Sequence, residues 1–169
     1  MWRQNKMTDF YKFLADHRIE YDRHDHPTVF TVEDVNRLVP PLPGAKTKNL
    51  FLCDSKGKKH FLVVVRDEKR VDLKALPGIL GIKKLRFGSP DRLKKHLGVD
   101  PGSVSLFAVV NDSDIAVEVI IDNDLWASDA YQFHPLVNTS TLVISKDNLE
   151  RFLNKTGHKA QILDVPGVQ

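Results

Sequence analysis

The sequence predicts a single compact α/β domain in which a mixed β-sheet is flanked by helices. The chain has 169 residues, which suits one domain with a real core and is too short for two ordinary ones. Helical and strand patterns are interspersed along it, and two pairs of apolar runs have the form of hairpins, which require antiparallel strands. We see no internal repeat and no interdomain linker, so residues 1–169 are expected to form one domain.

Two short helices are predicted before residue 44. The first spans Met7–Arg18, with Thr8 as its N-cap. The second begins at Thr31, whose hydroxyl can accept a hydrogen bond from the Asp34 amide, and it ends before Pro40. The residues expected to bury the second helix against the core are Val32, Val35, Leu38 and Val39.

Two hairpins are predicted in the centre of the chain. The first joins Asn49–Cys53 to His60–Val65 through a turn-forming segment. Both runs are nearly continuous in hydrophobicity, as expected of strands covered on two faces. The second hairpin joins Ser105–Val110 to Ile115–Ile121 through the polar turn at Asn111–Asp114.

Capping residues indicate the remaining elements. Ser89 and Pro90 form a strong helix start, and Gly98 is a typical helix end. The predicted elements are, in order, a helix over 72–80, a strand over 85–87, a helix over 90–97, a strand over 141–144, a helix between Ser145 and Gly157, and a strand over 160–163.

The net charge is only +3, but the charged residues are unevenly distributed. Residues 46–95 contain 15 Lys and Arg against 5 Asp and Glu (net +10), whereas residues 96–130 contain 7 acids and no Lys or Arg (net −7). A locally basic third of a chain can bind a phosphate backbone even when the whole protein is almost neutral. The other interpretation is that both blocks are solvated faces, which neutralise each other in the fold.

Several common active-site patterns are absent. The sequence has no G-x-x-x-x-G-K-[ST] phosphate loop, no G-x-G-x-x-G turn and no G-x-S-x-G elbow. His24 and His26 stand two apart without any further metal-ligand motif, so we expect no metal and no cofactor. Cys53 is the only cysteine and is expected to pack in the core rather than to act as a nucleophile. No apolar run is long enough to span a membrane, and the cytosol is the expected compartment.

Polar residues concentrate in three short loops that each precede an apolar strand, at Gly44–Asn49, Pro101–Ser105 and His134–Thr139. Lys48 lies at a strand edge, and Gly102 allows backbone N–H groups to approach a ligand closely. A lysine with backbone donors and no obvious nucleophile favours stabilisation of an oxyanion during attack by water. Taken singly, each loop is also explained by ordinary loop chemistry, such as a solvated lysine or a turn glycine.

These three loops and their flanks resemble the prolyl-tRNA synthetase-associated editing domains, also called the YbaK-like superfamily. The matching stretches occur in the family's order and span nearly the whole chain. Each stretch is short, but jointly they are specific. They are His26–Glu33, Gly44–Leu52, Val71–Leu73, Phe87–Pro90, Pro101–Ser105, Asn111-Asp112, Phe133–Leu136 and Asn138-Thr139.

The resemblance implies a partly barrel-like sheet and hydrolysis of mischarged tRNA in trans, in the service of translation fidelity. The subgroup that this chain resembles most consists of free-standing enzymes that deacylate alanyl-tRNA(Pro). Members of the superfamily use a lysine at the position matching Lys48 and a glycine loop matching Gly102 onward. That loop often reads Gly-x-x-x-Pro, whereas this chain has Leu106 at its last position. The departure bears on loop rigidity and pocket shape, and therefore on which amino acid is removed.

The resemblance also assigns roles to individual residues and partners. It implies a catalytic role for Lys48, Gly102 and Ser103, in which the lysine holds the substrate end or the developing charge. It implies substrate binding by Phe30, Thr31, Asn49, Val104, His134, Pro135 and Asn138. The implied partners are the acceptor stem of tRNA(Pro) and prolyl-tRNA synthetase. Candidates to contact the tRNA are Lys56, Lys58, Lys59, Lys83, Lys84, Arg86, Arg92, Lys94 and Lys95.

Two alternatives stay open from the sequence. The same scaffold serves in deacylases for cysteinyl-tRNA(Pro) and for seryl- or threonyl-tRNA. Outside the enzyme class, it serves as a non-catalytic module that senses an amino acid or regulates transcription.

Overall fold

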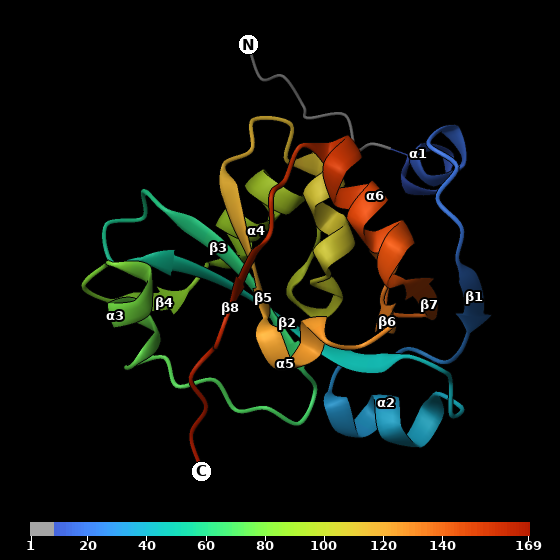
Figure 1. The fold of residues 1–169 in the computed structure, drawn as a ribbon, viewed down its shortest axis with the longest axis horizontal. Coiled ribbons are helices and arrows are strands. Elements are labelled where there is room, and N and C mark those ends of the chain that lie inside the picture. Colours follow the sequence, from blue (N-terminus) through green and yellow to red (C-terminus); the bar gives the residue numbers. More distant parts are fainter. Residues whose placement is uncertain (1–8) are drawn as a thin grey trace.

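The fold is a mixed eight-stranded sheet with helices packed around it (Figure 1). The structure is a computed structural model that describes residues 9–169, so the predicted N-cap Thr8 lies outside the described residues. The helices are α1 (Phe10–Asp16), α2 (Val32–Leu38), α3 (Leu76–Leu80), α4 (Pro90–Leu97), α5 (Asn123–Trp126) and α6 (Lys146–Thr156), with 3₁₀ helices η1 (Pro101–Ser103) and η2 (Leu106–Asn111). The strands are β1 (Asp22–Asp25), β2 (Ala45–Asp54), β3 (His60–Arg66), β4 (Leu85–Phe87), β5 (Val117–Asp122), β6 (Ala130–Phe133), β7 (Ser140–Ser145) and β8 (Gln161–Leu163).

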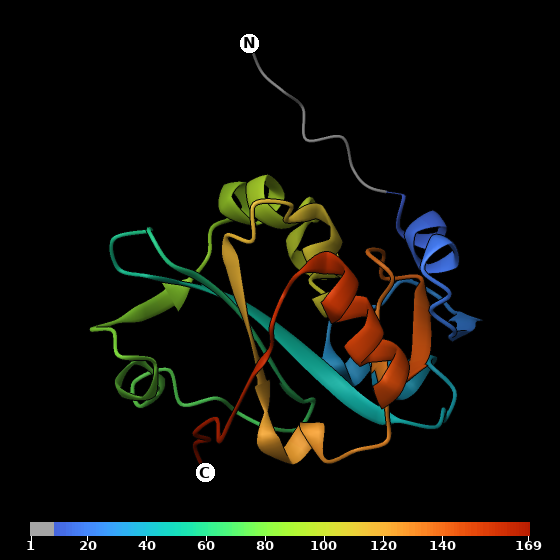
Figure 2. The same ribbon diagram turned by 45° about the horizontal axis from the view of Figure 1, so that its top comes forward.

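The β2–β3 hairpin forms the centre of the sheet, whose strand order is β1-β7-β6-β2-β3-β5-β8. Antiparallel pairs join β2 to β3, β6 to β7 and β1 to β7, while parallel pairs join β2 to β6, β3 to β5 and β5 to β8. The short β4 pairs with the last three residues of β2. The predicted mixed sheet is thus confirmed, and Figure 2 shows the long hairpin running diagonally through the domain.

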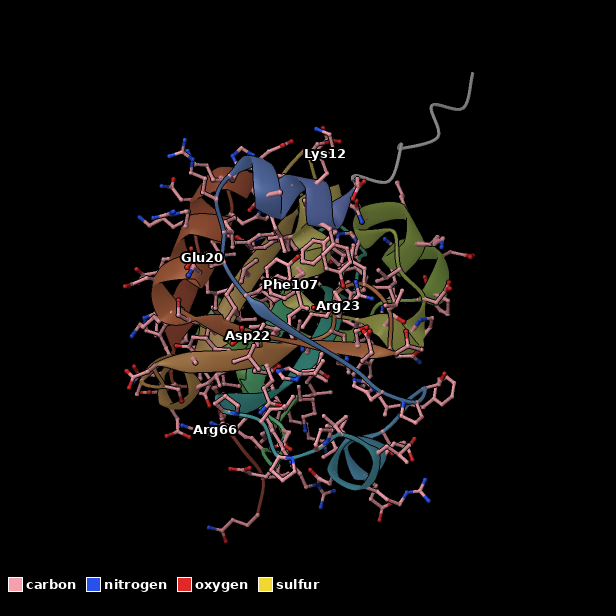
Figure 3. All side chains as sticks on the ribbon, turned by 90° about the vertical axis from the view of Figure 1, so that its right-hand side faces the viewer. Lys12, Glu20, Asp22, Arg23, Arg66 and Phe107 are labelled. Carbon is pink, nitrogen blue, oxygen red and sulfur yellow. The ribbon has the colours of Figure 1, made fainter. Side chains whose placement is uncertain are left out.

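Two hydrophobic clusters cover opposite faces of the hairpin. Phe51 and Leu62 belong to the larger cluster, which α1, α4, α6 and η2 complete, whereas Leu52 and Val63 belong to a smaller one under α3. Side chains alternate along a strand, so a strand covered on both faces needs an apolar residue at nearly every position. In Figure 3, Phe107 lies deep among the side chains of the larger cluster. Cys53 is fully buried, which confirms the prediction that it packs in the core.

Most predicted helix ends are confirmed by their capping contacts. The Thr31 hydroxyl accepts from the Asp34 amide at 3.0 Å, and the hydroxyls of Ser89 and Ser145 cap α4 and α6 in the same way. Within the described residues, the side chain of Asp9 caps α1 by accepting from the Lys12 amide. The predicted helix over 72–80 begins only at Leu76, because residues 72–75 form a turn on the Asp72 carboxylate.

The second predicted hairpin is wrong. Leu106–Asn111 forms the 3₁₀ helix η2, and β5 pairs in parallel with β3 instead of returning along this segment. The Ser105 hydroxyl caps the Phe107 amide, and the buried Asp112 carboxylate accepts from the Val117 amide at 2.9 Å. An apolar run buried on all sides does not distinguish a strand from a buried helix, and the Ser105 cap favours the helix here.

The prediction for the buried face of α2 is also largely wrong. Of its four expected core residues only Val39 is buried, at 7% exposure, while Val32, Val35 and Leu38 are half-buried. The strand β6 and the short helix α5 were not predicted from the sequence. Within residues 9–169, no helix is long and apolar enough to cross a membrane.

Candidate functional site

A small cavity lies where α2 faces the start of β2 and the end of β6. Its volume is about 40 Å³. One ordered water needs roughly 10–15 Å³ of such space, so the cavity holds only a few non-hydrogen atoms. Val32 and Val35 form its apolar wall, which explains why these valines of α2 are not packed into the core. The other lining residues are Lys46, Thr47, Asn49, Asp67, Gln132, Phe133, His134 and Thr141.

The Asn49 side chain is held in one orientation. Its Oδ1 accepts a hydrogen bond of 3.0 Å from the Leu106 backbone N–H. Because a backbone N–H can only donate, the acceptor must be the amide oxygen, and this assigns the Nδ2 group as the other end of the side chain. Within residues 9–169, Nδ2 has no hydrogen-bond partner. Asn49 therefore contributes a free donor to the cavity.

His134 is held in one tautomer by a backbone carbonyl. Its Nδ1 lies 3.0 Å from the Ser140 oxygen, and since a carbonyl only accepts, Nδ1 carries the proton and Nε2 is left as an acceptor. Burial lowers the pKa of His134, the hydrogen bond to the Ser140 carbonyl raises it, and the nearby His26 lowers it. The ring is thus neutral at pH 7, with an unprotonated nitrogen available to a ligand.

His26 stands behind His134, at 6.1 Å between ring centroids. Its Nδ1 donates to the Pro27 carbonyl at 2.9 Å, and its Nε2 accepts from the Thr141 hydroxyl at 2.8 Å. Both nitrogens of this ring are therefore engaged, and the Thr141 hydroxyl is turned toward His26. His26 thus holds the hydroxyl of Thr141, which lines the cavity.

Lys48 lies on the other face of β2 from Thr47 and Asn49, because side chains alternate along a strand. Its ammonium donates to the Lys69 backbone carbonyl. Burial lowers its pKa, the Asp67 carboxylate raises it and the Arg70 charge lowers it. The Lys48 side chain does not line the cavity. Its charge interacts with the charge of Asp67, which does line it.

The glycine loop meets Phe30 and Asn138 beside the cavity. A Cβ atom at Gly102 would lie 3.3 Å from the Phe30 ring and 3.6 Å from Asn138 Nδ2, so a larger residue would crowd both side chains. Phe30 is 72% exposed, and Thr31 uses its hydroxyl to cap α2. Leu106, four residues beyond Gly102, joins this loop to the cavity through its hydrogen bond to Asn49.

The structure thus brings together only part of the predicted substrate-binding set. Asn49 and His134 line the cavity, while Phe30, Gly102 and Asn138 form a separate group around the glycine loop. Ser103 and Val104 are half-buried in that loop, and Pro135 is buried next to His134. The lining residues that the sequence analysis missed are Lys46, Thr47, Asp67, Gln132, Phe133 and Thr141.

One of these missed residues was within reach of sequence reasoning. The first hairpin was predicted, and its observed register pairs Thr47 with Arg66. Extending the first predicted strand back by three residues and the second forward by two along this register places Asp67 beside Lys46, in the loop that also contains Lys48. By contrast, Gln132 and Thr141 come from β6 and β7, which join the site only through tertiary pairing.

The nine predicted tRNA-contacting residues gather at the far end of β2, and we call them the hairpin-tip surface. They come from the β2–β3 turn, from the segment around β4 and from α4, and β4 pairs directly with the end of β2 (Figure 1). All are exposed except Arg92, whose guanidinium donates to the Gly57 carbonyl at 2.9 Å and so ties α4 to the turn. Within residues 9–169, Lys94 alone among the nine forms an ion pair, with Asp100 at 3.7 Å.

Other residues of the basic block are neutralised by the acidic block. Lys69 lies 2.8 Å from the buried Asp122, and Arg66 lies 3.0 Å from Asp124. The interpretation that the two blocks neutralise each other is therefore correct for these pairs, and phosphate binding by the basic block stays a prediction. Arg66 and Lys69, next to α5 and β5, are paired within the fold, whereas all residues of the hairpin-tip surface except Arg92 are exposed.

Comparison with known proteins places this arrangement in a family. The aminoacyl-tRNA editing domain family matches residues 26–152. The chain is 36% identical over 152 residues to the prolyl-tRNA editing protein ProX of Acetoanaerobium sticklandii, covering 90% of this chain and 93% of that protein. It is 36% identical over 154 residues to the prolyl-tRNA synthetase associated domain-containing protein 1 of Danio rerio, covering 90% and 83%.

A solved structure has the same fold. It is described as a candidate trans-editing enzyme for prolyl-tRNA synthetase and superposes with a TM-score of 0.67 at 17% identity, covering 99% of both chains. The match between the folds extends over the whole α/β domain. The chain therefore belongs to the aminoacyl-tRNA editing domain family and is an aminoacyl-tRNA hydrolase, as the resemblance of its loops predicted.

Proposed function

We propose that this protein removes alanine from mischarged alanyl-tRNA(Pro), in trans and in the cytosol. The observation that carries the choice of amino acid is the size of the cavity, about 40 Å³, with Val32 and Val35 as its apolar wall. A methyl side chain fits this space, whereas a proline ring adds atoms that the wall does not accommodate. Exclusion by steric conflict is the route by which a small pocket rejects the correct, larger amino acid.

The free polar groups of the cavity suit hydrolysis of an ester. The Asn49 Nδ2 group donates to the ester carbonyl oxygen and stabilises the negative charge that develops there. The neutral His134 Nε2 accepts a hydrogen bond from the attacking water and orients it. Water adds to the carbonyl carbon, the bond to the ribose oxygen breaks, and the ribose hydroxyl leaves with a proton. The products are free alanine and uncharged tRNA.

Lys48 and the glycine loop act around this centre. The Lys48 ammonium fixes the Lys69 carbonyl and places a positive charge behind Asp67. In this proposal its positive charge makes the electrostatic potential in the cavity more favourable for the developing oxyanion. Gly102, Ser103 and Val104, with Phe30, form the wall against which the terminal nucleotide of the tRNA packs. An exposed aromatic ring such as Phe30 is a stacking platform for a base.

The hairpin-tip surface receives the acceptor stem in this proposal. β2 has ten residues and links the cavity to this surface. At about 3.3 Å per residue the strand spans roughly 30 Å, so the tRNA end extends along the hairpin from the basic surface to the cavity. The same geometry leaves the opposite side of the domain, which carries α6, free for contact with prolyl-tRNA synthetase.

The test is a deacylation assay with alanyl-, cysteinyl- and seryl-tRNA(Pro) as separate substrates. We expect release of alanine to be the fastest reaction. Lys48→Ala is expected to reduce it by roughly tenfold or more while the protein stays folded, because the positive charge that lies behind Asp67 is lost. Lys155→Ala, an exposed lysine on α6, is the matched control and is expected to act like the wild type.

Each outcome separates one part of the proposal. Preferential release of cysteine or serine overturns alanine as the substrate while leaving the editing activity in place. A wild-type rate in Lys48→Ala removes the assignment of Lys48. Tight binding of an amino acid without turnover of any of the three substrates supports the non-catalytic alternative.

A further inference from the structure

Asp67 places an unpaired carboxylate in the wall of the cavity. It follows β3 directly and is half-buried. Its backbone N–H donates to the Lys46 carbonyl at 3.2 Å, which extends the β2–β3 ladder by one step and fixes the position of the residue. Within residues 9–169, the carboxylate itself accepts no hydrogen bond and forms no ion pair within 4.0 Å.

The two nearest lysines of β2 are occupied elsewhere. The Lys46 ammonium donates to Asn36 Oδ1 at 2.7 Å, and the Lys48 ammonium donates to the Lys69 carbonyl. Neither therefore closes an ion pair on Asp67, although Lys48 lies near enough for an electrostatic effect. Among the residues that the structure describes, the Asp67 carboxylate therefore has no protein partner and is available to a cationic group of a ligand.

We infer that the Asp67 carboxylate binds the α-ammonium group of the aminoacyl ester. The inference rests on the proposed function, and it defines the substrate class more narrowly as aminoacyl-tRNA with a free amino group. In such a substrate the ammonium and the ester carbonyl are attached to the same carbon atom. Their partners must then lie in one small cavity, and Asp67 and Asn49 both line this one.

The pairing has a consequence for selectivity. An ammonium–carboxylate contact in a partly desolvated site is a charge-assisted hydrogen bond, and it is lost when the amino group is acylated. The site thus rejects peptidyl- and N-formylated aminoacyl-tRNA, which carry no free amino group, and leaves productive translation intermediates intact.

The experiment compares alanyl-tRNA(Pro) with N-acetylalanyl-tRNA(Pro) as substrates of the wild type, Asp67→Asn and Glu68→Gln. We expect the wild type to hydrolyse the unblocked ester roughly tenfold faster or more, because the charge-assisted contact is made by that substrate alone. In Asp67→Asn the ratio of the two rates is expected to fall close to one. Glu68→Gln removes the neighbouring, exposed carboxylate outside the cavity and is expected to keep the wild-type ratio.

A binding measurement makes the inference independent of turnover. L-Alaninamide carries the free ammonium group and a carbonyl, and N-acetyl-L-alaninamide lacks the ammonium group. In NMR titrations we expect the first compound to shift the backbone amide signals of residues 47–49 and 67 in the wild type but not in Asp67→Asn. The acetylated compound is expected to leave them unchanged in both proteins.

The outcomes distinguish the inference from the proposed function. Equal wild-type rates on the two tRNA substrates, or an unchanged ratio in Asp67→Asn, overturn the role of Asp67 and leave the editing function standing. Failure to hydrolyse either substrate overturns alanyl-tRNA(Pro) as the substrate of the proposed function, and the titrations then decide on Asp67. Equal binding of both amides overturns the inference in that case.

Discussion

Leu106 stands at the position where the glycine loop of related editing domains often has proline, and its backbone N–H is used. It donates to Asn49 Oδ1 and so fixes the Asn49 amide, while its side chain is fully buried. A proline at this position has no N–H and leaves the Asn49 amide free to turn. The leucine that departs from the family pattern therefore orients the side chain of Asn49 in the cavity.

Leu106→Pro tests this role. Leu106 is the first residue of η2, a position that proline tolerates because the helix does not use that N–H. We expect Leu106→Pro to lower the deacylation rate per folded molecule roughly fivefold relative to Leu106→Ala, since about 1 kcal/mol of orienting hydrogen bond is lost. Leu106→Ala keeps the N–H, and its cost is one of stability, about 2–5 kcal/mol by urea denaturation. Equal rates in the two variants contradict the role.

Among the helices, α4 is joined to the β2–β3 turn by a cluster of one arginine and two histidines. The Arg92 guanidinium donates to the Gly57 carbonyl and lies 3.2 Å from His60 Nε2, and the His60 and His96 rings are 4.2 Å apart. An arginine can only donate, so His60 is neutral here. Burial first, then the charges of His96 and Arg92, lower the pKa of His60 to about 4.

This cluster predicts a loss of stability in acid. Because the folded pKa of His60 is about 4 and its ordinary value is 6.5, the unfolded chain binds more protons between these values. The free energy of unfolding therefore falls as the pH drops through 6.5 toward 4. The share due to His60 between pH 7 and pH 4.5 is about 2 kcal/mol.

His60→Gln isolates that share, because glutamine offers Arg92 an acceptor that does not titrate. Urea denaturation at pH 7 and pH 4.5 is expected to show a smaller loss of stability in this variant than in the wild type. The pKa values of His96 and His134 are lowered as well, so part of the acid sensitivity persists in both proteins. Identical pH dependence in the two proteins contradicts the assignment to His60.

At the scale of the whole molecule, one strand joins the two surfaces that the proposed function needs. The cavity lies at the start of β2 and the hairpin-tip surface at its end. The separation keeps the strongly basic residues away from the reacting ester, while the β2–β3 hairpin provides a rigid link between them. Binding of tRNA and hydrolysis are thus expected to be affected by different substitutions.

Charge reversal at the turn tests the tRNA surface. Lys58→Glu with Lys59→Glu is expected to weaken tRNA binding roughly tenfold or more, and to reduce the steepness of its salt dependence by about two phosphate contacts. Filter binding between about 50 and 200 mM salt measures both effects. Lys155→Glu with Lys159→Glu changes the net charge equally on exposed residues elsewhere, and an equal loss of affinity in this control contradicts a specific surface.

The sequence-based predictions were correct where the structure depends on interactions between residues close together in the sequence. Thr31, Ser89 and Ser145 were identified as caps because a cap depends on a hydrogen bond three residues away. The η2 segment was assigned wrongly because its apolar run is buried on all sides. The buried Asp112 that follows it forms a 2.9 Å hydrogen bond with His158, a contact that local sequence patterns do not reveal.

The candidate site divides in the same way. Asn49 and His134 were named in advance, since each belongs to a short motif read along the chain, and the structure places both in the cavity. Thr141 and Gln132 carried no such signal. Lys48 shows the limit of a linear motif, because the alternation along β2 turns it away from the cavity that its neighbour Asn49 lines.

By itself the sequence determined the α/β class, the central hairpin, the capped helices and the editing family, because these depend on periodicity, local hydrogen bonds and ordered motifs. The tertiary structure alone decided that α2 turns two valines toward a cavity, that Leu106 orients Asn49, and that Asp67 is left without a partner there. The physical reason is that a cavity is made of groups that the rest of the fold leaves unsatisfied. Which groups are left over is known only once every other contact has been formed.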